Sequence, residues 1–116
     1  MPDQSEDFVA LINELNSAIE IFNSKKIAMI DKDREQGGDG HAVWDALDTL
    51  RRARSKLTQR ALDANQPGFD QLAKSAKAAT EDLNGSIDEL ETVSDVLNKV
   101  SRVVSLVGKI LIMFGG

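Results

Sequence analysis

The densest group of chemically active side chains in this sequence is a run of cations in the middle of the chain. Five cationic residues stand within the ten positions from 51 to 60, and no acidic residue lies among them. Side chains of this kind bind phosphate, nucleic acid or an acidic protein surface. The candidate basic patch comprises Arg51, Arg52, Arg54, Lys56 and Arg60.

The same patch has a simpler interpretation as the solvated face of a helix. In an antiparallel bundle its first two arginines lie level with Glu81 and Asp82, so a neighbouring helix balances part of the charge. A net charge of −5, one Trp and no Tyr leave the chain without the field or the stacking surface that nucleic-acid binders use. We therefore expect no nucleic-acid binding, and the patch stays a candidate site for an anion or an acidic partner.

Acidic side chains crowd the first glycine-rich segment, where a metal site would be sought. A calcium loop that starts at Asp31 has Gln36 in place of the required Gly and Ala42 in place of the bidentate Glu. A loop that starts at Asp33 fails as well, because Trp44 occupies that last position. The single histidine of the chain adds little to such a set. We expect a solvated turn here, with no metal and no cofactor.

The sequence contains few residues of the types that carry out catalysis. The sequence has no Cys, no Tyr and one His, so it offers no thiolate nucleophile and no evident acid–base pair. Without cysteine there are also no disulfide bonds and no thiolate metal ligands. We therefore expect a protein that is not an enzyme.

Two breaks divide the chain into helices. The segment from Gln36 to Gly40 contains three glycines, and Gln66-Pro67-Gly68 contains a proline, which lacks a backbone donor. Between the breaks, apolar residues recur at the three- and four-residue spacing of helices. The sequence predicts an all-α single domain over residues 1–116, an antiparallel bundle of three helices at about 5–34, 42–64 and 69–114.

The third predicted helix carries the longest apolar pattern. Fourteen positions from Phe69 to Phe114 alternate in steps of three and four, and thirteen of them are apolar, as along a coiled-coil seam. At 1.5 Å per residue this helix would span about 70 Å, whereas the first two would span roughly 33 to 45 Å. The seam beyond about Leu90 would then lack a partner in its own chain.

A turn at Asn84-Gly85-Ser86 is the alternative. The glycine would take the left-handed position that ends a helix, and the serine would form a capping box with Glu89. A fourth helix, from Ile87 to Phe114, would then fold back and complete a four-helix bundle. The apolar seam, however, continues through residues 84–86 without a change of phase, which a turn would not be expected to preserve. The long continuous helix is therefore the first prediction.

These features favour assembly over catalysis. A row of Val and Leu side chains at coiled-coil spacing self-associates or binds another helix. We therefore expect a non-enzymatic interaction protein that forms a homo-oligomer or docks a partner helix. The alternative is a membrane-active protein of the toxin or effector kind, which would expose the same apolar helix to lipid. The candidate interaction residues are Leu97, Val100, Val104, Val107, Leu111 and Phe114.

The amino-terminal residues bear on the location of the protein. Residues 1–7 are largely polar and acidic, unlike the basic region and apolar run of an export signal. The sequence therefore predicts a cytoplasmic protein, although export without such a signal stays open.

Overall fold

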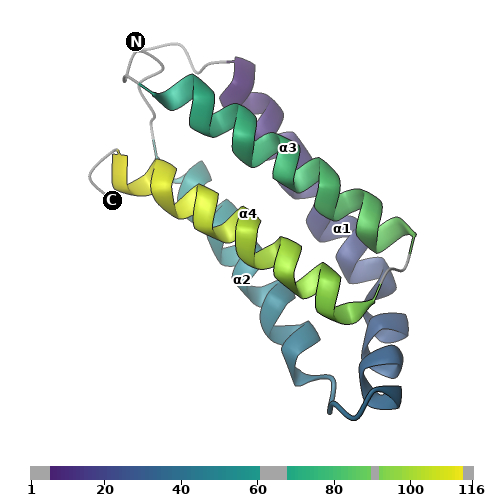
Figure 1. The fold of residues 1–116 in the computed structure, drawn as a ribbon. Helices are drawn as coiled ribbons and strands as arrows, with labels where there is room; N and C mark the ends of the chain where they lie inside the picture. The colour runs from purple at the N-terminus through teal and green to yellow at the C-terminus, as the bar shows by residue number, and fades with distance from the viewer. Residues whose placement is uncertain (1–5, 61–67, 90–91, 114–116) are drawn as a thin grey trace.

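The computed structural model describes residues 6–60, 68–89 and 92–113, and within these ranges the chain forms four helices (Figure 1). They are α1 (Glu6–Glu35), α2 (His41–Thr58), α3 (Phe69–Asp88) and α4 (Val93–Met113). Every regular element in these ranges is a helix, which confirms the predicted all-α class. The helices form a bundle that measures 50 × 23 × 19 Å.

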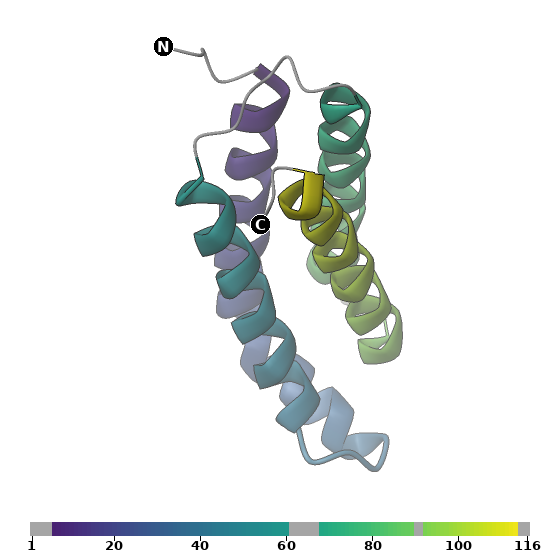
Figure 2. The same cartoon turned by 90° about the vertical axis from the view of Figure 1, so that its left-hand side faces the viewer.

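The helices pair into two antiparallel hairpins that lie against each other (Figure 1 and Figure 2). Within the hairpins, α1 packs on α2 and α3 packs on α4; between them, α1 packs on α3 and α2 packs on α4. The helices α2 and α3 therefore stand diagonally across the bundle, and so do α1 and α4. Because the chain reverses direction at each connection, the two contacts between hairpins join parallel helices.

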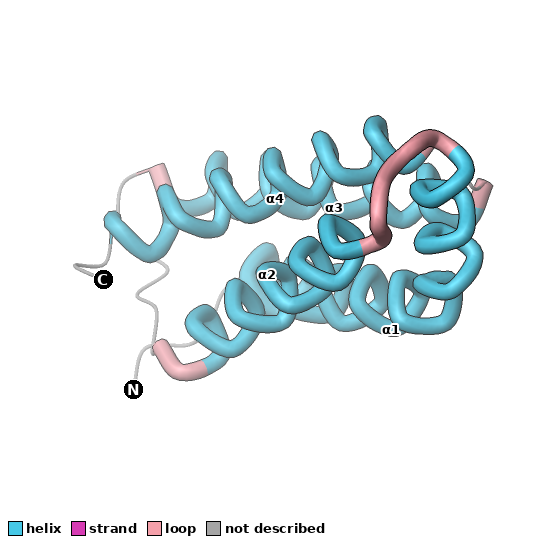
Figure 3. Tube along the Cα trace, turned by 90° about the horizontal axis from the view of Figure 1, so that it is seen from below, coloured by secondary structure: helices cyan, strands magenta, loops and turns pink. Residues whose placement is uncertain are grey.

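The turn between α1 and α2, seen from below in Figure 3, depends on glycine. Gly37 and Gly40 have φ angles of 96° and 83°, which favour glycine over other residues. A Cβ added at Gly40 would lie 2.6 Å from Ile30 Cγ2. The Gly40 amide also donates a hydrogen bond to Asp33 Oδ2 at 3.0 Å. The first predicted break is confirmed.

A single cluster of buried apolar side chains draws on all four helices. Most apolar residues at the predicted helical spacing in the first two helices lie in it, and Phe22, Leu50 and Leu57 are among the fully buried ones. The seam predicted for the third helix is buried as far as Leu83 except at Leu72, which is partly buried. The spacing of apolar residues therefore identified the inward face of each of these helices.

The continuous helix predicted from 69 to 114 is wrong, because α3 stops at Asp88 and α4 begins at Val93. Acidic residues gather at the carboxyl end of α3, where the helix dipole disfavours negative charge. Lys25 of α1 stabilises this end: its Nζ donates to the Asp88 carbonyl oxygen at 3.3 Å and lies 3.8 Å from the Asp88 carboxylate. The described residues therefore form a four-helix bundle, not a three-helix bundle.

The alternative turn at Asn84-Gly85-Ser86 is also misplaced, although the four-helix bundle that it implied is present. Gly85 lies inside α3 and has no positive φ. The Ser86 hydroxyl donates backward to the Asp82 carbonyl oxygen at 3.1 Å and caps no new helix. The Glu89 amide still donates to the Gly85 carbonyl oxygen at 3.0 Å, so the helix continues past the predicted turn.

The cap of α4 is Thr92. Its Oγ1 accepts a hydrogen bond from the Asp95 amide at 3.3 Å and donates one to the Asp95 carboxylate at 2.7 Å. A threonine followed three residues later by an acid, just before an apolar run, is a capping-box pattern. The sequence therefore contained the capping signal for the start of α4, six residues beyond Ser86, the predicted cap.

The apolar part of α4 is covered by the other helices of the chain, contrary to the expectation that the seam beyond Leu90 lacks a partner. The helix α4 folds back along α3 and α2, and its Val103, Val107 and Ile110 are buried. Each such side chain contributes about 1.5 to 3 kcal/mol when buried. Ile112, by contrast, remains 75% exposed.

The helix α2 ends at Thr58, earlier than the predicted end at 64. The Thr58 hydroxyl donates to the Ser55 carbonyl oxygen at 3.0 Å, and Gln59 Nε2 donates to Ser55 Oγ at 3.4 Å. Polar side chains that bond locally in this way compete with helix continuation. Residues 61–64 of the predicted helix lie outside the described residues.

Replacing Gly85 by alanine should stabilise the protein. The residue is helical, and a Cβ added there meets no atom within 4 Å, while alanine is favoured over glycine in a helix by about 1 kcal/mol. Thermal unfolding followed by circular dichroism should show a midpoint raised by roughly 4 °C. Gly40→Ala is the control and should lower the midpoint, because Gly40 has a positive φ and no free space. A lower midpoint for Gly85→Ala would instead favour the turn at this glycine.

Candidate functional site

Apolar side chains cover a wider face of α4 than one helix contact requires. One row faces the centre of the bundle, and none of its members is more than 4% exposed. A second row lies beside the first and faces α2, and its members stand seven positions apart: Leu97, Val104 and Leu111. The central row consists of Val93, Val96, Val100, Val103, Val107 and Ile110.

The candidate interaction residues divide between these two rows. Val100 and Val107 belong to the central row and are buried. Leu111 is buried at its margin, whereas Leu97 and Val104 are half-buried and pack against the core from outside. Phe114 lies outside the described residues. The part of the predicted seam that stays accessible is therefore mainly the second row.

A groove runs between α2 and α4, and we call it the α2–α4 groove. It contains three hollows in line, of about 290, 250 and 350 Å³. Apolar residues of α4 form one wall, and the small residues Ala46 and Ala53 of α2 stand opposite. Gly108 widens the groove, because no atom lies within 4 Å of a Cβ added there. Alanine and glycine thus leave room that larger side chains would fill.

The hollows repeat at the heptad spacing of coiled coils. On α2, the first hollow is lined at positions 45, 46 and 49, and the second at 49, 52, 53 and 56. On α4, the first is lined at 97, 100, 101 and 104, and the second at 104, 107, 108 and 111. Every residue of the first hollow therefore has a counterpart seven positions later in the second. Seven residues make about two helical turns, so a docked helix can place one side chain in each hollow.

The candidate basic patch divides between two faces of α2. Arg51 and Arg54 turn toward α1, where their guanidinium groups donate to Asn23 Oδ1 at 3.3 Å and to Asn16 Oδ1 at 3.2 Å. The other three cations stand four residues apart and border the α2–α4 groove: Arg52, Lys56 and Arg60. The structure therefore brings part of the basic patch and part of the apolar seam together in one groove.

The charge partners expected for the first two arginines, Glu81 and Asp82, are wrong, because α2 and α3 stand diagonally across the bundle. Arg52 instead pairs with Asp48 of its own helix at 2.9 Å. The Glu81 Oε1 atom lies 3.1 Å from Lys77 Nζ. The hydrogen bond to Glu81 and its negative charge raise the pKa of Lys77. Neighbouring helices therefore do not neutralise the groove side of the patch.

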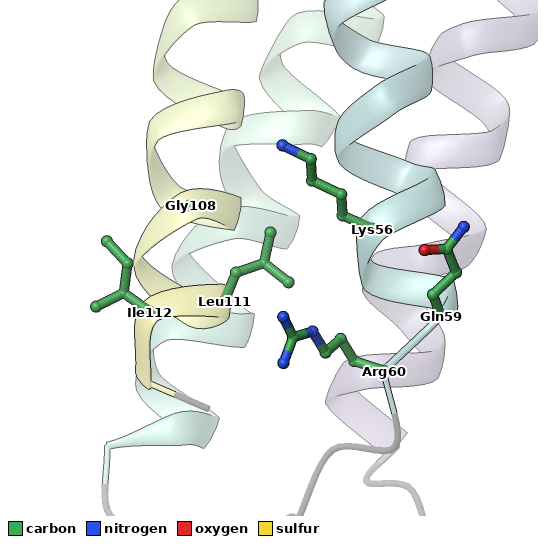
Figure 4. Close-up of a pocket in the computed structure, with 6 residues that line it drawn as sticks. All are labelled: Lys56, Gln59, Arg60, Gly108, Leu111 and Ile112. Carbon is green, nitrogen blue, oxygen red and sulfur yellow. The ribbon is translucent and has the colours of Figure 1, made fainter. Parts of the chain in front are cut away.

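Two cations stand at the apolar end of the groove (Figure 4). Lys56 of α2, and Arg60 two residues after α2 ends, extend toward α4, and Leu111 extends from α4 toward α2. Within the part of the chain that the structure describes, neither cation forms an ion pair. Charged donors beside an apolar wall suit a carboxylate carried by an apolar helix.

The opposite end of the groove is acidic. Asp45 borders the first hollow, and Asp48 follows it by three residues on α2. Both carboxylates are exposed, and Asp45 lies 3.3 Å from His41 Nε2. The charge along the groove side of α2 therefore changes from negative near its start to positive near its end.

The acidic residues around the first turn support the turn itself. Asp33 accepts the Gly40 amide, and the Asp39 carboxylate accepts the His41 amide at 2.9 Å. Across residues 6–60, 68–89 and 92–113, no three His, Cys, Asp or Glu side chains converge so as to hold a metal ion. The carboxylates of this segment thus have a local structural use.

A polar contact between α3 and α4 was not predicted. Lys99 donates to the Ser86 hydroxyl and lies 3.5 Å from the Asp82 carboxylate. A serine beside a lysine forms the catalytic pair of some hydrolases, but Ser86 is buried, so a substrate cannot reach its hydroxyl in this arrangement. The available signal was that Ser86 is the one polar member of the predicted seam. We interpret the contact as a tie between the two helices.

Trp44 lies away from the groove, beside α1. Its side chain is 47% exposed, and Lys26 Nζ stands 4.7 Å from its ring centroid. A cation over an aromatic face contributes a modest attraction at an exposed site. We assign Trp44 no part in the candidate site.

None of the helices in the described ranges combines the length and the apolar character needed to cross a membrane. Comparison with protein-family models, with curated protein sequences and with solved structures finds no match to this chain. The chemistry and geometry of the α2–α4 groove are therefore the basis for assigning a function.

Proposed function

We propose that this protein is a non-enzymatic interaction protein that receives a helix in the α2–α4 groove. The observation that carries the proposal is the heptad repeat of the hollows between two parallel helices. A helix laid on such a pair inserts residues seven positions apart into successive hollows, as knobs enter holes in a coiled coil. A second copy of the chain or another protein can supply that helix.

The lining of the groove defines the chemistry of the docked helix. Half-buried Leu97 and Val104, and the free space at Gly108, favour aliphatic side chains at seven-residue spacing. Lys56 and Arg60 favour acidic residues next to the last of these side chains. Such a helix would cover apolar surface that the bundle leaves partly in water, at about 25 cal/mol for each Å² buried.

Release of α4 onto lipid, the alternative function, has less support. The central row of α4 is buried against the other helices. A membrane would have to replace those contacts before it gained any of its own. Docking in the groove requires no such loss, because the second row already borders the surface.

Binding of a labelled helical peptide tests the proposal. The peptide carries leucine at every seventh position and glutamate beside the leucine row, and fluorescence anisotropy measures its dissociation constant. Gly108→Leu should raise that constant at least about tenfold, because the new side chain starts from a residue that lines two hollows and takes up space that the docked helix needs. The bundle should remain folded, since an added Cβ meets no atom within 4 Å and leucine favours helix.

Two further variants complete this test. Val104→Asp places a charge on the half-buried wall and should also weaken binding. Ser75→Asp, on an exposed position of α3, is the control and should leave binding unchanged. Equal binding by the wild type, Gly108→Leu and Val104→Asp would overturn the proposal. A wild-type chain that neither binds the peptide nor associates with itself would do the same.

A further inference from the structure

We propose that the α2–α4 groove docks the same groove of a second copy of this chain, with the two α2 helices antiparallel about a two-fold axis. This inference rests on the proposed function, because it names the partner of the same site. It is carried by the order of charges along α2 and by the symmetry of the second hollow.

The charges at the two ends of the groove side of α2 are complementary to each other. Asp45 and Asp48 come first, and Arg52 stands in the middle, paired with Asp48 of its own helix at 2.9 Å. Lys56 follows near the end of α2, and Arg60 comes two residues after that end. When two copies of this helix meet antiparallel, Asp45 lies opposite Arg60 of the partner copy, and Asp48 lies opposite Lys56 of the partner copy. Both pairs are centred near position 52, so one two-fold axis serves them together. The two cations that lack an ion pair within the described chain thereby gain carboxylate partners.

The apolar residues fit the same axis. The second hollow is lined by positions 49, 52, 53 and 56 of α2 together with positions 104, 107, 108 and 111 of α4. A two-fold axis through this hollow makes α4 of the partner copy antiparallel to α4 of the first copy. It brings Leu111 of the partner copy toward Val104 of the first copy. The space at Gly108 lies close to the axis, where two copies approach most closely. A small residue at that point permits the approach.

In the alternative dimer, the two-fold axis runs along the groove. Repulsion between like charges disfavours this dimer. This dimer lays α2 of one copy parallel to α4 of the other, so the end of α2 that carries Lys56 and Arg60 meets the end of α4 that carries Lys109. Like charges across an interface oppose association. The antiparallel arrangement instead has two opposite-charge contacts at each end of the interface. Near its axis it brings together the two copies of Arg52, each of which is paired with Asp48 of its own helix.

Two complementary charge variants test the arrangement. The first is Lys56→Glu with Arg60→Glu, and the second is Asp45→Lys with Asp48→Lys. All four positions are exposed or half-buried, so both variants should fold, which far-ultraviolet circular dichroism checks. In the antiparallel dimer, either variant alone sets like charges against each other at both ends. An equimolar mixture of the two restores opposite charges at both ends.

Sedimentation velocity at low ionic strength, where charge screening is weak, measures the outcome. We expect wild-type dimers and a dissociation constant at least about tenfold higher for each variant alone. The mixture should associate as the wild type does. Lys74→Glu with Lys77→Glu, on α3, makes the same change of charge away from the groove and should leave the dimer intact.

Several outcomes would overturn the inference. Self-association of both variants at wild-type strength would do so, and so would an equimolar mixture that stays monomeric. A wild-type chain that is monomeric but binds the labelled peptide would remove the second copy as partner and leave the proposed function standing. A wild-type chain that neither self-associates nor binds the labelled peptide would overturn both the proposed dimer and the proposed function.

Discussion

A chain that ends at Val100 should be unfolded. The truncation removes the second half of α4 and with it four buried side chains, among them Val103 and Ile110. At about 1.5 to 3 kcal/mol for each, the lost free energy is roughly 6 to 12 kcal/mol, comparable with the whole stability of such a domain, about 5 to 15 kcal/mol. Far-ultraviolet circular dichroism should show little helix and no cooperative thermal transition.

The matched control is a chain that ends at Met113. It keeps every buried residue of α4 that the structure describes, so it should give a helical spectrum and a cooperative transition. A folded chain ending at Val100 would show that the end of α4 is not part of the core. The same reasoning means that deleting the apolar end cannot test self-association, because it removes the fold along with the surface. Point substitutions such as Gly108→Leu avoid this difficulty.

Helix positions and inward faces were predictable because they depend on local spacing. Apolar residues at intervals of three and four mark a buried stripe wherever the helix packs, and glycines such as Gly37 and Gly40 interrupt helices without reference to the rest of the fold. The break between α3 and α4 was harder to place. The seam keeps its phase from Leu83 to Val93 across the turn, and phase alone says which side is buried, not whether the helix continues. Only the cap at Thr92 carried that information.

The candidate site was predicted as two separate features and not as one groove. The sequence identified the basic patch on one helix and the apolar seam on another, but their meeting depends on which helices become neighbours. The helices α2 and α3 stand diagonally across the bundle, so α2 packs on α4, and no local pattern specifies that arrangement. The two rows on α4 were likewise merged into one seam, because Val100 and Val107 of the central row and Val104 of the second row follow one another at intervals of three and four.

Replacing Ile87 by alanine should destabilise the protein by about 2 to 5 kcal/mol, the usual loss for a buried isoleucine. Ile87 is 0% exposed, although it lies outside the predicted seam. It is buried because α3 packs on both α1 and α4 and therefore needs an apolar face wider than one row. Urea unfolding followed by circular dichroism should show a lower midpoint with an unchanged slope.

Ile27→Ala is the matched control for this prediction, since it makes the same substitution inside a helix. Ile27 is 59% exposed, so its loss should change the free energy of unfolding by no more than about 0.5 kcal/mol. The contrast between the two isoleucines isolates burial from helix propensity, which is the same for both. If Ile87→Ala costs no more than Ile27→Ala, then α3 does not continue past Gly85 as a packed helix. In that case the turn to α4 must lie earlier than Asp88, and the register that forms the α2–α4 groove would be lost with it.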